Sequence, residues 1–212
     1  MKLQLTNNNY TGKLFTFCGL DGSGKSTYLK YVADLLQHGN NQYEITKQPT
    51  DAVRKSTIFR TYMDQQDHSE FDYRALSLLA ASDRVQHNYQ YIVPKLKNGK
   101  YILSDRYVFS CLANLRARGY GSDNWIYEIA SHLVKPDIAF FFDVDVETAI
   151  KRVRKRPDEK DRFIDIELQY KLRSEYLSIA EQVGGIVVST NQSFEYCIKK
   201  IEHALRTYNV NV

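Results

Sequence analysis

Short apolar runs alternate with helical patterns along the whole chain. Strand-like runs are expected at residues 13–19, 43–48, 101–107, 138–144 and 185–189, separated by segments with apolar residues at helical spacing. The runs at 101–104 and 138–144 are apolar at nearly every position, as expected when both faces of a parallel sheet are covered. The alternation predicts an α/β fold, a five-stranded parallel sheet flanked by helices on both faces.

A long helical pattern covers residues 71–96, and Pro94 near its end is expected to bend it or end its regular hydrogen bonding. In a parallel sheet of this kind, ligands lie at the carboxyl ends of the strands. The residues that follow each strand-like run are therefore the candidates for chemistry.

Composition fits one soluble domain, residues 1–212. The chain has 212 residues, of which 43% are hydrophobic and 25% charged. No signal peptide and no membrane-spanning run is visible, so a cytoplasmic protein without a membrane partner is expected. Cys18, Cys111 and Cys197 lie far apart without CxxC spacing, which favours reduced packing residues over a zinc site or disulfides.

Residues 19–27 fill the G-x-x-x-x-G-K-[ST] pattern between a strand-like and a helix-like segment. Glycines let successive backbone N–H groups face one anion at a helix N-terminus. Lys25 is expected to reach the β- and γ-phosphates, and the Ser26 hydroxyl to ligate Mg²⁺. A glycine turn with a chance lysine is the alternative, but the strand–helix setting favours a P-loop NTPase fold that binds a nucleoside triphosphate. The predicted nucleotide-binding residues of this segment are Gly22, Ser23, Gly24, Lys25, Ser26 and Thr27.

Asp105 and Arg106 follow the third strand-like run. Asp105 is expected to face the Mg²⁺ at the cradle, and Arg106 a second anion. The alternative is a surface ion pair. Asp143 and Asp145 follow the next run, where Asp145 precedes a helical pattern and is better explained as a helix cap than as a metal ligand.

The formal net charge is +4, and the excess is local. Basic residues concentrated in one segment suit a compact polyphosphate better than a long nucleic acid, so no nucleic-acid partner is expected. The other interpretation is a solvated helix end. Seven basic residues fall in this segment: Lys151, Arg152, Arg154, Lys155, Arg156, Lys160 and Arg162.

Taken together, these motifs resemble those of thymidylate kinases over nearly the whole chain. The resemblance rests on residues 19–27, 78–87, 105–107 with Ser110 and 112–113, 135–137, 154–156 and 161–163. It implies phosphoryl transfer from ATP, with Mg²⁺, to a deoxynucleoside monophosphate, most closely dTMP. It also implies a short helical lid at about residues 152–162 and a homodimer packed through long helices.

The resemblance also implies residue roles. Asp21 would lie beside the acceptor sugar 3′-hydroxyl, Arg106 would bind the acceptor phosphate, and Arg84 would reach the base edge. In one branch of the family an arginine follows the P-loop aspartate. Here Gly22 does, so catalytic positive charge would come from the lid. The remaining implied residues are Arg156 and Arg162 as catalytic arginines, and Arg152 and Thr190 at the ATP side.

Three positions depart from the family pattern at the acceptor. Ala80 stands where a phenylalanine usually stacks on thymine, Asn114 where an aromatic residue closes the sugar side, and Lys47 where an arginine is usual. Stacking on an aromatic ring contributes about 1–3 kcal/mol. Either the acceptor differs, or neighbours compensate; Tyr107, Phe109 and Tyr73 are the candidate substitutes.

Two alternatives to a dTMP kinase therefore stay open. One is a similar kinase whose acceptor is another nucleotide or a phosphorylated metabolite. The other is a P-loop NTPase or nucleotide-binding module without kinase activity, which would not need the second anion site at Arg106.

Overall fold

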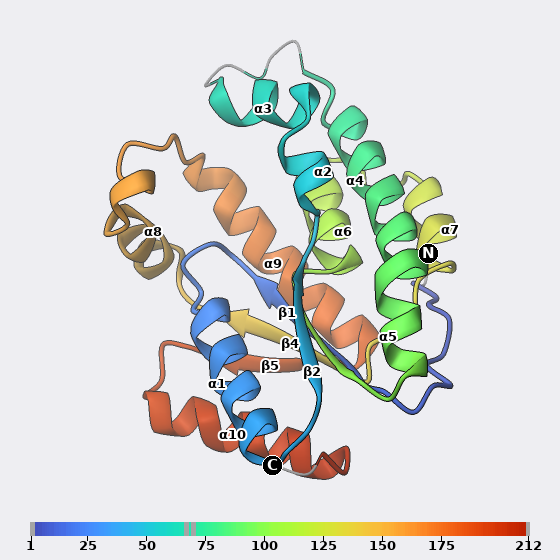
Figure 1. Cartoon of the computed structure of the whole chain (residues 1–212). Helices are drawn as coiled ribbons and strands as arrows, with labels where there is room; N and C mark the ends of the chain where they lie inside the picture. Colours follow the sequence, from blue (N-terminus) through green and yellow to red (C-terminus); the bar gives the residue numbers. More distant parts are fainter. Residues whose placement is uncertain (1–2, 66–67, 69–70, 211–212) are drawn as a thin grey trace.

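The computed structural model describes residues 3–65, 68 and 71–210. Its strands pair in parallel in the order β2-β3-β1-β4-β5, so the predicted five-stranded α/β architecture is confirmed (Figure 1). The strands are β1 (Leu14–Gly19), β2 (Tyr43–Lys47), β3 (Tyr101–Asp105), β4 (Ile138–Asp143) and β5 (Ile186–Ser189).

Helices cover both faces of this sheet. The α-helices are α1 (Lys25–His38), α2 (Asp51–Arg54), α3 (Thr57–Asp64), α4 (Tyr73–His87), α5 (Val93–Lys97), α6 (Val108–Ala117), α7 (Trp125–Ala130), α8 (Val146–Arg154), α9 (Ile166–Val183) and α10 (Phe194–Thr207). A π-helical turn, η1 (Asn88–Ile92), joins α4 to α5, and a 3₁₀ turn, η2 (Pro157–Glu159), follows α8.

Alternate side chains of each strand enter two different cores, because successive residues of a strand point to opposite faces. Phe15 and Phe17 pack with α1 and α10 on one face, whereas Leu14 and Cys18 pack with α6 and α9 on the other. All three cysteines are buried and free, which confirms them as packing residues.

The helical pattern around Pro94 is confirmed with its predicted interruption. The chain stays helical from Tyr73 to Lys97, but its bonding widens to a π-helical turn over Asn88–Ile92, just before Pro94 in α5. Proline has no N–H to donate to the preceding turn, so the regular ladder breaks there.

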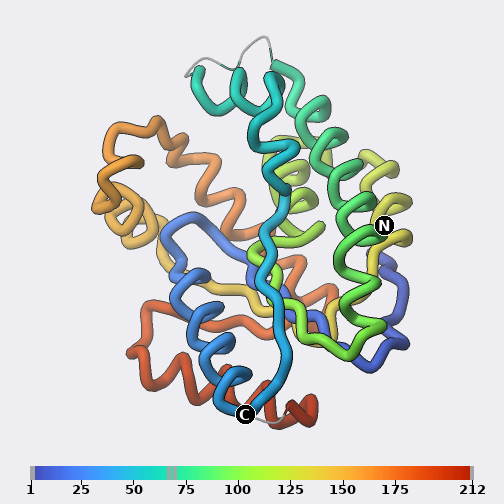
Figure 2. The backbone as a smooth tube through the Cα atoms, viewed as in Figure 1, coloured from blue at the N-terminus to red at the C-terminus, as the bar shows by residue number. Residues whose placement is uncertain are grey.

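The segment between β2 and α4 leaves the sheet (Figure 2). The chain rises through α2 and α3 beyond the carboxyl ends of the strands, and α4 returns along the other side. This excursion places α3 at the far end of the region where ligands of such a sheet bind. Within the described residues, no helix is both long and apolar enough to cross a membrane.

Candidate active site

The loop between β1 and α1 folds into an anion cradle. Gly19, Gly22 and Gly24 have φ of 138°, 83° and 86°, the left-handed region in which a side chain is strained. At Gly22 a Cβ would also lie 2.2 Å from the carbonyl oxygen of Ala149 in α8. The glycine is thus required both by its own backbone and by the helix behind it.

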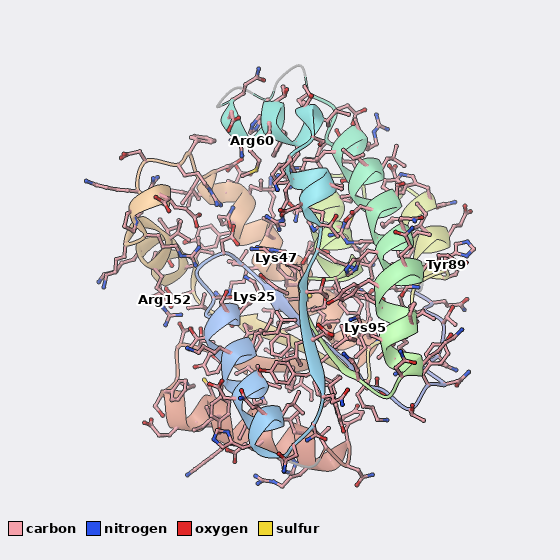
Figure 3. The ribbon with its side chains drawn as sticks, in the orientation of Figure 1. Lys25, Lys47, Arg60, Tyr89, Lys95 and Arg152 are labelled. Carbon is pink, nitrogen blue, oxygen red and sulfur yellow. The ribbon has the colours of Figure 1, made fainter. Side chains whose placement is uncertain are left out.

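Lys25 lies in the middle of this cradle, at the start of α1 (Figure 3). Its ammonium donates to the carbonyl oxygens of Gly19, at 3.1 Å, and Leu20, at 2.6 Å. Burial, together with the nearby charge of Arg106, lowers the pKa of Lys25 to about 8. Ser26 and Thr27 are exposed at the cradle, whereas Ser23 is fully buried and its hydroxyl has no hydrogen-bond partner in the described part of the chain.

Arg106 faces the cradle from the end of β3. It is a non-glycine residue with a φ of 70°, a costly conformation of the kind found at functional sites. Its guanidinium pairs with the carboxylate of Asp21 and donates to the Tyr176 hydroxyl at 3.3 Å. Burial opposes its charge, but Asp21 outweighs that effect and raises the pKa of Arg106.

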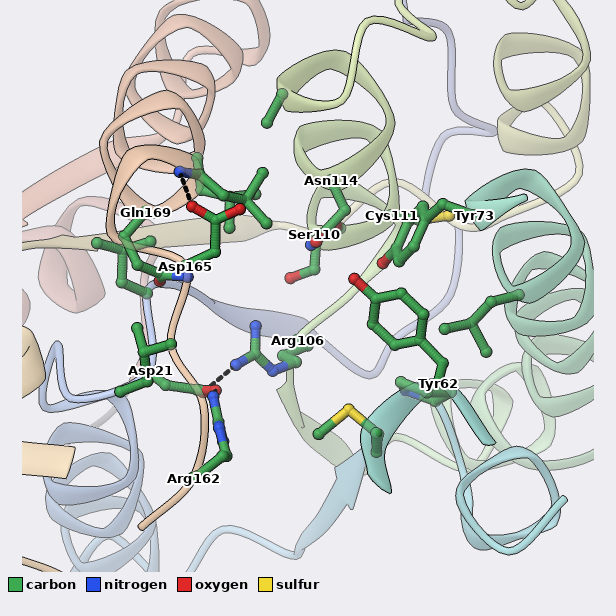
Figure 4. A pocket seen from close by; sticks show the side chains of 18 of the residues that line it. Asp21, Tyr62, Tyr73, Arg106, Ser110, Cys111, Asn114, Arg162, Asp165 and Gln169 are labelled. Atoms are coloured by element: carbon green, nitrogen blue, oxygen red, sulfur yellow. Dashed lines mark hydrogen bonds and ion pairs between the residues drawn. The ribbon is translucent and has the colours of Figure 1, made fainter. Parts of the chain in front are cut away.

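Asp21 also binds the lid. Nη2 of Arg162 donates to its second carboxylate oxygen at 3.0 Å (Figure 4). Burial would raise the pKa of Asp21, yet the charges of Arg106, Lys25 and Arg162 hold it well below its usual range. Asp21 is therefore a fixed negative charge that links the cradle, the acceptor side and the lid.

Asp105 has one carboxylate oxygen 3.4 Å from the ammonium of Lys47. The other, Oδ1, is buried and has no hydrogen-bond partner among the residues that the structure describes. Asp105 and the exposed Ser26 line the same cavity, and hard oxygen donors of this kind suit Mg²⁺. The residues present thus fit the predicted metal pair.

One cavity of about 1610 Å³ joins these groups. A single ligand pocket usually measures about 300–1,000 Å³, so this cavity has room for two substrates. The predicted site residues that line it are Asp21, Gly22, Gly24, Lys25, Ser26, Thr27, Lys47, Ala80, Arg84, Asp105, Arg106, Asn114, Arg156 and Arg162.

Arg152 and Thr190 lie behind the cradle and are not among the residues that line this cavity. Arg152 donates to the Gly22 carbonyl oxygen at 3.3 Å, and to the hydroxyl and carbonyl of Thr190 at 3.1 and 3.0 Å. The Thr190 hydroxyl donates to the Ser23 carbonyl oxygen at 3.1 Å. In this arrangement both residues support the loop from outside.

The lid begins in α8 and returns to the cavity through η2. Glu159 accepts hydrogen bonds from Arg156, at 2.7 Å, and from Arg162, at 2.6 Å. A single carboxylate therefore positions both predicted catalytic arginines.

Asp143 and Asp145 are already engaged by protein groups. The Asp145 carboxylate accepts from the Thr148 N–H, at 2.8 Å, and caps α8, as predicted. Arg173 binds Asp143 with two hydrogen bonds, at 2.7 and 2.9 Å.

At the acceptor end the cavity wall comes from α4 and α6. Ala80 presents only a methyl group, and Arg84 turns back onto its own helix, donating to the Ala80 carbonyl oxygen at 2.7 Å. Of the three candidate replacement rings, Tyr73 lines the cavity, whereas Tyr107 and Phe109 are buried in the core. The prediction that Tyr107 or Phe109 replaces the missing ring is therefore wrong, because both side chains are buried away from the cavity.

Arg54, Tyr62 and Arg118 also line the cavity and were not predicted as site residues. Burial and the charge of Arg106 lower the pKa of Arg54, so this second guanidinium lies in the field of the acceptor-side arginine. Its place, five residues after Pro49, fits no general motif. Arg54 could have been found only by treating every arginine that follows a predicted strand as a candidate.

A P-loop cradle and an opposed arginine in one cavity define a P-loop nucleotide kinase. The family model described as thymidylate kinase matches residues 17–201, and the chain belongs to the thymidylate kinase family. It is therefore a nucleoside monophosphate kinase.

Similar proteins come from archaea and bacteria. A probable thymidylate kinase of Pyrococcus horikoshii is 36% identical over 77% of this chain and 80% of its own. One of Methanococcus vannielii is 38% identical over 80% of this chain and 78% of its own. A thymidylate kinase of Geobacillus sp. is 32% identical over 86% and 89%.

Proposed function

We propose that the protein transfers the γ-phosphoryl group of ATP to dTMP, giving ADP and dTDP, with Mg²⁺ as cofactor. The observation that carries the proposal is Arg106 facing the Lys25 cradle within one cavity. A protein that only hydrolyses or senses a nucleotide needs no second anion site. The names of the relatives favour thymidylate as the acceptor.

The chemistry needs little covalent help. The acceptor phosphate has a second pKa of about 6, so at neutral pH its oxygen is already a nucleophile and no general base is required. That oxygen attacks the γ-phosphorus as the bond to the β-γ bridging oxygen breaks and ADP leaves. Positioning and charge neutralisation are the protein's tasks.

The residues divide these tasks by position. The cradle and Lys25 hold the donor phosphates, while Arg106 and Arg54 hold the acceptor phosphate. Arg156 and Arg162 approach from the lid, where they neutralise charge on the transferring group and exclude water. Ser26 and Asp105 would hold Mg²⁺, which neutralises phosphate charge when bound.

The test is a screen of the purified protein with ATP, Mg²⁺ and each common ribo- and deoxyribonucleoside monophosphate, following ADP and the new diphosphate. We expect the highest kcat/KM with dTMP. Lys25→Ala and Arg106→Ala should each lower kcat/KM at least about a hundredfold, with circular dichroism unchanged. Near-normal turnover of either variant would remove that residue from the mechanism.

A second candidate is a kinase of the same build with another acceptor. The small Ala80 in the cavity wall favours it, because the usual stacking ring is missing there. The same screen decides: a higher kcat/KM for any other monophosphate than for dTMP would select this alternative.

We further propose that residues 1–212 form one kinase domain that acts in the cytoplasm as a homodimer. The range includes residues 1–2, 66–67, 69–70 and 211–212, which lie outside the described part. Support for the dimer comes from Leu78 of α4 and Tyr89 of η1, which are 48% and 75% exposed. Leu78→Glu should halve the mass measured by light scattering, and an unchanged mass would remove this face from the interface.

A further inference from the structure

An aromatic wall stands at the acceptor end of the cavity, although α4 offers only the methyl group of Ala80 there. Tyr62 of α3 and Tyr73 of α4 line the cavity with ring centroids 5.3 Å apart. In Figure 4 both lie on the side away from Asp21 and Arg162, with Arg106 and Ser110 between. A nucleotide with its phosphate at Arg106 could therefore place its planar base beside these two rings.

The helix that carries Tyr62, α3, is not anchored in the hydrophobic core. None of the residues of α3 is buried. Its position over the cavity must therefore depend on contacts made by individual side chains.

Arg118, just after α6, supplies such contacts. Its guanidinium donates to the Tyr62 hydroxyl, at 2.7 Å, and to the Asn114 amide oxygen, at 2.7 Å. Its central carbon also lies 3.8 Å from the centroid of the Tyr73 ring, a close cation–π contact. One side chain thus ties together three parts of the acceptor wall, on α3, α4 and α6.

These contacts direct Arg118 toward the aromatic wall and Asn114. Its two terminal nitrogens are engaged and its plane is stacked, whereas Arg106 and Arg54 face the acceptor phosphate region. Asn114 is held in turn: its amide nitrogen donates to the Ser110 carbonyl oxygen at 2.8 Å. The contacts of Arg118 and Asn114 thus fit a role in positioning the Tyr62 ring better than a role in binding an anion.

We propose that Tyr62 is a specificity-determining residue whose ring packs against the acceptor base, and that Arg118 is the positioning residue that holds it there. The inference rests on the proposed function for the identity of the acceptor, and it assigns the base-stacking role to α3 in place of α4. The ligand class is a nucleoside monophosphate with an intact base.

The test compares dTMP with 2-deoxyribose 5-phosphate, which has the same phosphate and sugar but no base. Binding of each is measured by calorimetry without ATP, and transfer to each by ADP release. Base stacking contributes about 1–3 kcal/mol, so Tyr62→Ala should weaken dTMP binding about 5- to 150-fold. Binding of the sugar phosphate should stay within about twofold.

Arg118→Ala should weaken dTMP binding about fivefold or more, and raise KM for dTMP with kcat nearly unchanged. Tyr62→Phe keeps the ring but loses the bond to Arg118, so it should fall between wild type and Tyr62→Ala. The matched control is Arg74→Ala. Arg74 also stacks on a tyrosine ring, that of Tyr120, at 4.9 Å, but does not line the cavity, and its loss should leave dTMP binding unchanged.

Two failures can be told apart. If Tyr62→Ala or Arg118→Ala binds dTMP as wild type does, or weakens both ligands equally, the inference is overturned whatever the turnover. If wild type binds dTMP through Tyr62 but transfers phosphate to no monophosphate, the proposed function fails and this inference stands.

Discussion

Asp21 and Lys25 differ in how their surroundings shift their pKa values. Asp21, close to Arg106, Lys25 and Arg162, has a pKa far below its usual range and stays ionised. Lys25 is buried near Arg106, which lowers its pKa to about 8. A bound triphosphate brings negative charge to Lys25 and must raise that pKa again, so binding and protonation are coupled.

This coupling predicts a pH dependence of triphosphate affinity. Below pH 8 Lys25 is protonated in the free protein and binding takes up no proton. Above pH 8 the free protein loses the proton and binding must restore it, so affinity should fall up to about tenfold per pH unit. Calorimetric titration of ATP from pH 7 to pH 9.5 measures the effect.

The control is Lys25→Ala, in which affinity should be weak at every pH and lack this dependence. The ATP phosphates are fully ionised across the range, because their last pKa is about 6. A wild-type affinity that stays constant up to pH 9.5 would contradict the lowered pKa.

Residues at fixed offsets from a strand end could be predicted from the sequence. Lys25, Ser26, Asp105 and Arg106 were expected to share one cavity, and they do. Tyr62 and Arg118 could not be predicted, because their meeting depends on how two short helices after β2 fold back over the cavity. No local pattern encodes a hydrogen bond between two residues so far apart in the chain.

Among the elements, α8 serves the P-loop as a rigid backing. The Gly22 backbone packs against the Ala149 carbonyl of α8, and Arg152 of the same helix binds the Gly22 carbonyl. Arg152 thus also belongs to the mechanical support of the loop. The position of the lid helix and the shape of the cradle are coupled through this contact.

Gly22→Ala tests the coupling against Gly184→Ala. Gly184 ends α9 at a φ of 65° with nothing within 4 Å of an added Cβ, so its variant should lose only about 1–2 kcal/mol of unfolding free energy. At Gly22 the same strain is joined by a backbone clash, so the loop or α8 must move. We expect a larger loss of stability in urea, and kcat/KM lower by at least about a hundredfold.

The two variants should differ in both measurements. Gly184→Ala should keep nearly full activity, because its position is remote from the cradle. If Gly22→Ala matched Gly184→Ala in stability and in turnover, the contact between Gly22 and α8 would not be needed for function.

Strands and caps were the most predictable elements. The strand-like runs predicted each strand to within two residues at either end, and Asp145 was correctly predicted to cap α8. The excursion through α2 and α3 was not predicted, since both helices are short, with four and eight residues, and no residue of α3 is buried in the core.

For the molecule as a whole, a single arginine joins the lid to the P-loop. Arg162 binds Asp21 in the loop after β1, at 3.0 Å, and Glu159 in the lid, at 2.6 Å. A transferring phosphoryl group would compete with these carboxylates for the guanidinium. Closure of the lid and neutralisation of the reacting phosphate are therefore expected to be one event.

Arg162→Ala should separate that event from nucleotide binding. Because Arg162 reaches the reacting region from the lid, its loss should lower kcat by about a hundredfold and change ATP affinity by less than about threefold. Arg154→Ala is the control: Arg154 is exposed, does not line the cavity and contacts the Lys160 carbonyl, so kcat should be near normal. Steady-state kinetics with calorimetric ATP titration distinguish the cases. An unchanged kcat with weakened ATP binding would make Arg162 a nucleotide clamp, and the lid would then only retain the donor.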